Sequence, residues 1–144
     1  MITVNSHDFD AVVKQLEYGV SCLLDPNNLR TRIGKLVVEQ TNQRFYEQRD
    51  PDGKTWETLK PATIQRKHGR TDRLMDKLDL MRSIGFEPTD NGVFISSSLP
   101  SERVTPHQFG YEKKNIPQRA IFGLSLENKA EIIDETLTYL QGIF

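Results

Sequence analysis

Hydrophobic residues recur every three or four positions in three long stretches of the chain, which is the spacing of amphipathic helices. The stretches are residues 7–24, residues 26–48 and the residues that follow Ser125. Asp25-Pro26 predicts the start of the second helix, because a carboxylate caps helix starts and proline is tolerated at the first helical position. Ser125 is the expected cap of the last helix. We expect the apolar stripes of the first and last helices to face the core; they comprise Phe9, Val12, Val13, Leu16, Val20 and Leu23, and Leu126, Ala130, Ile133, Leu137 and Leu140.

The second helix is predicted to end in a tight turn at Asp50-Pro51-Asp52-Gly53. Proline presets the backbone for such a turn and glycine accepts a positive φ. The acidic residues superficially match a calcium loop, but the EF-hand pattern needs a glutamate six residues after the glycine, and this chain has Leu59 there. Trp56, the only tryptophan, follows directly. We expect it to anchor the turn to the core.

The spacing of apolar residues changes in the middle of the chain. Two short helices are predicted, at residues 61–67 and at about residues 74–84. Two apolar runs then flank the Asn91-Gly92 step, a strong signal for an antiparallel hairpin. The alternation within the second run predicts that Val93 and Ile95 face one side of the hairpin.

The region that follows the hairpin contains three prolines, so residues 98–117 are predicted to be irregular. Residues 119–122 predict a last strand or an extended segment. The order of elements predicts one α+β domain over residues 1–144, with the N-terminal helices and the C-terminal helix packed on a small antiparallel sheet.

Composition and charge exclude some classes of protein. The chain is 36% hydrophobic and 27% charged, and its 19 basic and 20 acidic residues nearly cancel. A dedicated nucleic-acid binder would carry a basic excess. Residues 60–77 are the local exception, where six basic residues face Asp72 and Asp76, a balance of plus four. This segment is either a solvated loop or a contact for a polyanion; its basic residues are Lys60, Arg66, Lys67, Arg70, Arg73 and Lys77.

Patterns for catalysis, metal binding or cofactor binding are missing from the sequence. Neither a phosphate-binding loop nor a nucleophile elbow is present. His7, His68 and His107 stand far apart, without the short spacing of a zinc site. Cys22 is the only cysteine, so no internal disulfide forms, and we expect a small buried apolar residue there. We therefore predict no enzyme, no metal and no cofactor.

The sequence also predicts no membrane partner. Nothing approaches the roughly 18 apolar residues of a transmembrane helix. The N-terminus soon turns acidic, which is not the pattern of a signal peptide. We expect the protein to be made and used in a cytoplasm, unless it leaves as part of a particle.

Several motifs occur in a fixed order along residues 30–140. In this order they resemble the phage virion morphogenesis family, the tail-completion proteins of contractile-tailed phages and related prophages. The chain departs from that family's pattern at Leu78-Asp79 and at Val104-Thr105-Pro106. The matching segments are Phe45 with the turn from Asp50 to Trp56; Leu59, Pro61 and Thr63; Leu78 to Ser83-Ile84; His107-Gln108-Phe109-Gly110; and Ile116 to Ser125.

The resemblance implies a structural role in tail completion or head–tail joining, as a ring-forming or ring-docking subunit with a tail-terminator-like fold. The expected partners are further copies of the chain, with a hexamer favoured by the resemblance, and phage tail tube, neck or connector proteins. A ring around the DNA path would also contact duplex DNA non-specifically in its lumen. We expect the protein in the bacterial host cytoplasm during assembly and then in the virion tail or neck.

Two other functions stay open at this point. One is a nucleic-acid-binding or packaging accessory protein that uses residues 60–77. The other is a small hydrolase whose site has no recognisable pattern; a well-formed pocket with convergent polar groups would be its first support.

Residue roles follow from the same resemblance. Arg66, Lys67, Arg70 and Arg73 are the expected DNA contacts in the lumen. His107, Gln108 and Arg119 are candidate interface residues, although each also suits a role inside the fold. Residues 66–74 and 98–116 are expected to be loops that become ordered on assembly. Structural roles are expected for Pro51, Gly53, Trp56, Phe109, Gly110, Pro117, Phe122 and Gly123.

Overall fold

The computed structural model describes residues 6–75 and 78–143, and their architecture is α+β. The helices outnumber the strands, which form one two-stranded antiparallel sheet in the described residues. The predicted α+β class is therefore confirmed. In chain order the elements are α1 (Ser6–Leu24), α2 (Asn27–Glu47), α3 (Pro61–Arg66), α4 (Asp79–Arg82), β1 (Ile84–Thr89), β2 (Gly92–Ser97), α5 (Ser101–Phe109), the 3-10 helix η1 (Glu112–Lys114) and α6 (Leu126–Ile143).

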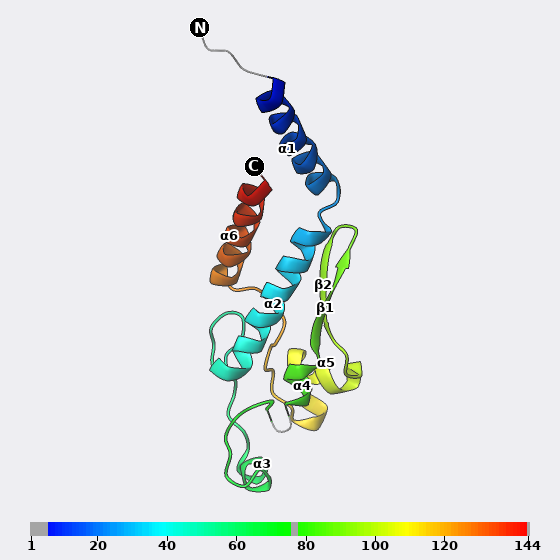
Figure 1. Cartoon of the computed structure of the whole chain (residues 1–144). Helices are drawn as coiled ribbons and strands as arrows, with labels where there is room; N and C mark the ends of the chain where they lie inside the picture. The colour runs from blue at the N-terminus through cyan, green and yellow to red at the C-terminus, as the bar shows by residue number, and fades with distance from the viewer. Residues whose placement is uncertain (1–5, 76–77, 144) are drawn as a thin grey trace.

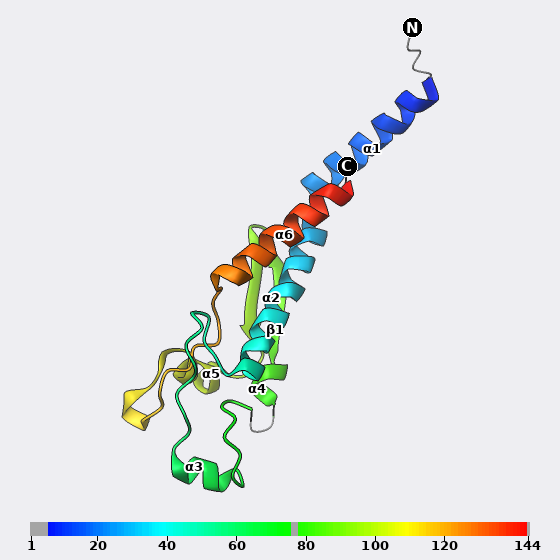
Figure 2. The ribbon, with the colours of Figure 1, turned by 90° about the vertical axis from the view of Figure 1, so that its left-hand side faces the viewer.

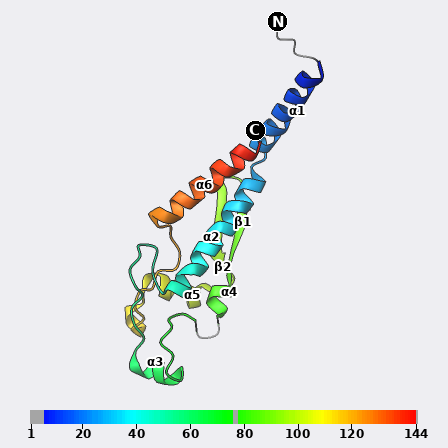
Figure 3. The same cartoon turned by 60° about the vertical axis from the view of Figure 1, so that its left-hand side comes forward.

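The molecule is elongated, with α2 at its centre (Figure 1). This helix packs across both strands of the hairpin, and α6 packs on α2. The main neighbour of the C-terminal helix is α2, which itself lies across the sheet. The C-terminal end of α6 reaches α1, which extends beyond the rest of the chain at one end (Figures 2 and 3). Helix α3 forms the opposite end.

The predicted hairpin is confirmed, with Thr89 paired to Gly92 across the turn. Phe86 pairs with Ile95 and Pro88 with Val93, so these side chains share one face of the sheet. That face meets α2 at Gly34. A Cβ atom built on this glycine would lie only 2.2 Å from Cδ2 of Phe86, so the missing side chain lets the helix and the strand approach closely.

The core lies between the C-terminal half of α2 and the segments beyond it. Phe45 and Ile121 are fully buried, and the Phe45 ring meets Trp56 edge to face at 5.5 Å between centroids. The predicted anchoring role of Trp56 is thus confirmed. The other members of this buried cluster are Leu80, Met81, Ile84 and Val104.

Two predictions about secondary structure are wrong. Residues 98–117 are not irregular, because they contain α5 and η1; α5 even includes Pro106 in its interior. The helix expected at about residues 74–84 is shorter in the structure, where only α4 (Asp79–Arg82) is helical. Leu74 and Leu78 both have a positive φ, 59° and 57°, and a left-handed residue interrupts a right-handed helix. Residues 119–122 form the extended segment, which was one of the two alternatives.

Contrary to the prediction, the apolar stripe of α1 is not core where the structure describes its side chains; the side chain of Phe9 lies outside that description. Val12, Leu16, Val20 and Leu23 are 52–54% exposed. The reason is position: α1 lies beyond the sheet and touches α6, with Gly19 as its buried residue. The stripe of α6 is also partly uncovered, since Leu126, Ile133 and Leu137 are exposed. Cys22, expected to be buried, is only half-buried.

Candidate functional site

The extended segment at residues 119–122 is held by side chains from other parts of the chain. Gln108, on α5, makes three hydrogen bonds to it. Its Oε1 accepts from the backbone N–H groups of Ile121 (2.8 Å) and Phe122 (2.9 Å), and its Nε2 donates to the carbonyl oxygen of Phe122 (3.1 Å). Gln108 therefore satisfies three backbone groups of two consecutive residues.

Two further donors reach the same segment. Trp56 Nε1 donates to the carbonyl of Ala120 at 3.0 Å, and Arg44 Nη1 donates to the carbonyl of Ile121 at 2.8 Å. Arg44 is buried, and this burial lowers the pKa of its guanidinium, an effect opposed by the charges of Asp50 and Glu47. Such a buried cation needs hydrogen-bond partners.

Arg44 also connects α2 to the start of α6. Its Nη2 donates to Asn128 Oδ1 at 2.5 Å. The same oxygen accepts from the backbone N–H of Ser125 at 3.1 Å, while Ser125 Oγ accepts from the N–H of Asn128 at 2.9 Å. This reciprocal pair is a capping box, so the predicted cap at Ser125 is confirmed. Sequence reasoning missed both Arg44 and Asn128. For Arg44 the available signal was its position, since it is a long polar residue next to Phe45 on a predicted helix.

Arg119 acts inside the fold, which was one of the two roles that the sequence left open. Only 6% of the residue is exposed. Its Nε donates to the carbonyl of Glu57 at 2.8 Å and its Nη2 to that of Thr58 at 3.1 Å. Its backbone N–H donates to the carbonyl of His107 at 2.7 Å. The hydrogen bonds of Arg119 and Gln108 among the described residues lie within the chain, and their assignment to an interface stays a prediction.

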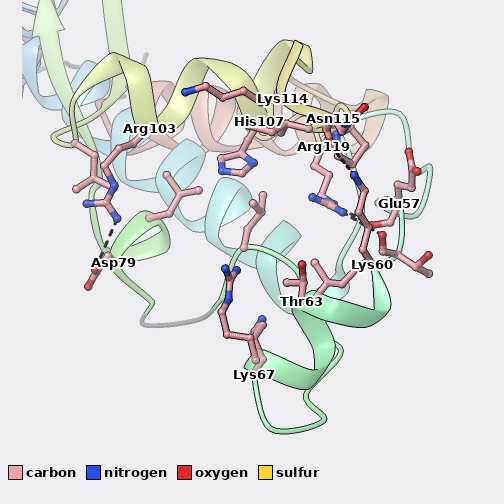
Figure 4. Close-up of a pocket in the computed structure, with 18 residues that line it drawn as sticks. Glu57, Lys60, Thr63, Lys67, Asp79, Arg103, His107, Lys114, Asn115 and Arg119 are labelled. Carbon is pink, nitrogen blue, oxygen red and sulfur yellow. Dashed lines mark hydrogen bonds and ion pairs between the residues drawn. The ribbon is translucent and has the colours of Figure 1, made fainter. Parts of the chain in front are cut away.

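A cleft of about 960 Å³ opens between α3 and the segment that runs from α5 to Arg119 (Figure 4). Its floor is apolar, with Leu59, Leu80, Leu99 and Ile116 among the lining residues. Its rim carries exposed basic side chains. The basic rim residues are Lys60, Arg66, Arg103 and Lys114, and the exposed acidic ones are Glu57 and Asp79.

His107 projects from α5 into this cleft (Figure 4). Among the described residues, its buried Nδ1 atom has no hydrogen-bond partner. Burial lowers the pKa of the imidazole, and the positive charge of Arg119 lowers it further. The side chain is therefore neutral at physiological pH, and its Nδ1 atom is buried beside the cleft.

The four predicted DNA contacts do not form one free basic face. Arg66 is exposed on the cleft rim. Lys67 is only 8% exposed, because its Nζ donates to the carbonyl of Asp72 and forms an ion pair with the Asp72 carboxylate at 3.4 Å. The same carboxylate pairs with Arg70 at 3.5 Å. The assignment of Lys67 to a lumen contact is thus not supported by its position.

Arg73 is also tied to the body of the protein. Gln48, at the end of α2, accepts from the backbone N–H of Arg73 and donates to its carbonyl at 3.0 Å. The rest of the basic segment extends to Asp76 and Lys77, which lie outside the described residues. Residues 66–75 therefore include anchored positions as well as exposed ones.

The predicted structural motifs meet beside the 119–122 segment. Asp50 Oδ1 accepts from the N–H groups of Asp52 and Lys54, which closes the turn around Gly53 with its φ of 84°. A Cβ atom at Gly123, where φ is 149°, would approach Pro51 Cγ to 2.7 Å. Phe122 and Pro117 are half-buried, and Gly110 has a φ of 77°. Phe109 is 71% exposed and lies outside the buried cluster of the described residues, so its structural role stays a prediction.

The site has the character of a binding surface. In the part of the chain that the structure describes, no group of three histidine, cysteine, aspartate or glutamate side chains is placed to hold a metal ion. The described helices also include none that is long and apolar enough to cross a membrane. The polar side chains of the motifs hold backbone groups of the same chain.

The comparison with protein families gives the particular family. The sequence model of the phage virion morphogenesis family matches residues 6–141. The chain therefore belongs to the phage virion morphogenesis family, and its role lies in the building of the phage particle. No curated protein and no solved structure matches the chain.

Proposed function

We propose that this chain is a structural subunit that completes the phage tail or joins head to tail, without catalysis. The observation that carries the proposal is the family match over residues 6–141. The side-chain geometry supports it, because Gln108, Arg119 and Arg44 bind backbone groups and do not converge on a position for a reacting atom. Such an arrangement stabilises one rigid shape, which is what an assembly subunit needs.

The subunit acts as a member of a ring or docks on one. Its two ends differ, with an exposed apolar helix at one end and a basic cleft at the other. When one end of a protomer binds the other end of the next, the rotation between them either closes a ring or gives a filament. The proposed partners are other copies, six by the family resemblance, and tail tube, neck or connector proteins.

The direct test uses a prophage from which the gene has been deleted. We expect induction to give particles with unfinished tails or with heads and tails apart, and wild-type protein supplied in trans to restore infectious titre. Electron microscopy of the lysate distinguishes the two defects. Normal, infectious particles in the absence of the gene would overturn the proposal.

A contact with duplex DNA in the lumen is a second, narrower proposal, carried by the exposed Arg66 on the cleft rim. Its test is the pair Arg66→Glu and Arg70→Glu, leaving the buried Lys67 intact. If DNA passes this surface, particles should assemble but lose infectivity. Unchanged infectivity would remove the DNA contact and leave the assembly role in place.

The packaging alternative makes a different prediction for the isolated protein. An accessory that uses the basic segment should bind generic duplex DNA without self-association, and its affinity should fall steeply with salt as counterions are released. Electrophoretic mobility shifts at two salt levels measure this directly. Absence of a shift at low salt would eliminate that alternative.

A further inference from the structure

Helix α1 presents an apolar face that the rest of its own chain leaves uncovered. Val12, Leu16, Val20 and Leu23 follow one another at spacings of four, four and three residues, which places them on one side of the helix. Each is at least half exposed. A contiguous exposed apolar surface of this kind is typical of a protein–protein contact.

The charges on α1 and just after it are mainly acidic. Asp10 and Glu17 lie on α1, Asp25 follows it, and Lys14 is the single basic residue from position 10 to position 25. These residues give a net charge of minus two, from three acids and one lysine. The partner of α1 should therefore combine an apolar floor with basic groups around it.

The cleft between α3 and α5 has this combination. Its floor is formed by leucine and isoleucine side chains, and four exposed basic residues against two acidic ones give its rim a net charge of plus two. Within the cleft, Nδ1 of His107 lacks a hydrogen-bond partner among the described residues. The cleft and α1 lie at opposite ends of the molecule, so they do not meet within one chain (Figures 1 and 2).

We infer that α1 of one copy docks in the α3–α5 cleft of the next copy. This inference rests on the proposed assembly function and names its interface. The contact is heterologous, because a different surface is used on each side, and repetition of it links copies head to tail. Pairing of α1 with α1 of a second copy is less suitable, because it brings the same acidic edges together.

The α1 side is tested with the double variant Leu16→Gln and Val20→Gln, which removes apolar surface and keeps helix-compatible residues. The control, Ala11→Gln and Ser21→Gln, places glutamine at two other exposed positions of the same helix and leaves its charge unchanged. Light scattering across a concentration series should show oligomers for the wild type and the control, with the variant's midpoint concentration raised about tenfold or more. Far-UV circular dichroism verifies that every variant is folded.

The cleft side is tested with Arg103→Glu and Lys114→Glu, both on the rim. The control is Lys54→Glu with Arg82→Glu, an equal charge change at exposed positions outside the cleft. We expect the cleft variant to remain monomeric and the control to associate like the wild type. Raised salt should weaken the wild-type contact in part, since its charges are screened and its apolar surface is not.

Mixing the α1 variant with the cleft variant is the decisive experiment. Each alone should be a monomer of 16.6 kDa. Together they should give a one-to-one dimer and nothing larger, since the mixture keeps one intact α1 and one intact cleft. If α1 paired with α1, the cleft variant would dimerise alone and mixing would add nothing, which overturns the inference.

The same variants separate this inference from the proposed function. A wild-type protein that stays monomeric at every concentration overturns the docking of α1, as does an α1 variant that associates normally. In either case the deletion test in the prophage still decides whether the chain completes the particle. If docking is confirmed but the α1 variant supports normal particles, the interface stands and the ring role fails.

Discussion

Replacement of Gln108 by alanine is the sharpest test of the account of the fold. The side chain satisfies two backbone N–H groups and one backbone carbonyl on residues 121 and 122. Alanine removes all three bonds and introduces no clash. Ile121 is fully buried, so water cannot reach its N–H without a rearrangement of the core.

The expected loss of stability follows from these contacts. An unsatisfied buried donor or acceptor costs roughly 1–3 kcal/mol. Because Phe122 is half-buried, we count its two groups at the low end, and the sum for Gln108→Ala is about 2–4 kcal/mol. For a chain of this length that corresponds to a fall in Tm of roughly 5–15 °C.

Urea denaturation followed by tryptophan fluorescence measures this effect, since Trp56 binds the same segment. The control is Gln118→Ala. It removes one exposed hydrogen bond, which Gln118 donates to the backbone carbonyl of Gln108, and should change stability by less than about 0.5 kcal/mol. If Gln108→Ala loses no more than the control, the 119–122 segment does not depend on side-chain hydrogen bonds, and the reasoning is refuted.

Three further predictions concern other parts of the fold. Gly34→Ala should lower the free energy of unfolding by about 1–3 kcal/mol through overpacking against Phe86, and Phe86→Leu should recover part of that loss; a neutral Gly34→Ala in thermal melts would show that the helix and strand can separate. Phe45→Ala should cost about 3–5 kcal/mol in urea denaturation because the ring is fully buried, and a loss below that of an exposed control such as Tyr46→Ala would contradict the assigned core. His107 has a pKa below its usual 6.5 in the folded state, so the unfolded state binds more protons and stability should fall as pH drops through 6.5. His107→Asn should flatten this slope between pH 7.5 and 5.5, and equal slopes would disprove the buried neutral imidazole.

The sequence by itself determined the local elements with a strong periodic or turn signal. The two long N-terminal helices, the C-terminal helix with its Ser125 cap, the turn at Gly53 and the hairpin all follow from spacing and from residues with special backbone preferences. The family resemblance likewise came from motifs in order along the chain, and the family match agrees with it. These signals are local, because each is created by residues within a few positions of one another.

Only the tertiary structure decided what the motifs do together. Gln108 lies far along the chain from Trp56 and Arg44, and only the fold shows that all three bind backbone groups of residues 120–122. Arg119, in the same segment, binds the carbonyl oxygens of Glu57 and Thr58. The same holds for Lys67, which sequence placed in an open basic loop and which the fold buries against Asp72. The position of a basic residue in the sequence does not show which acidic partner will neutralise its charge in the fold.

Helix α1 shows that the sequence also does not determine which surface covers apolar residues. Periodicity correctly predicted its helix and its apolar stripe, but a stripe says only that some surface will cover it. Whether that surface belongs to the same chain depends on where the connection at Asp25-Pro26 directs the helix, and here it directs α1 beyond the sheet. Hydrophobic burial is non-directional, so the sequence fixes the need for a partner, and the three-dimensional arrangement decides that most of this face remains open for another molecule.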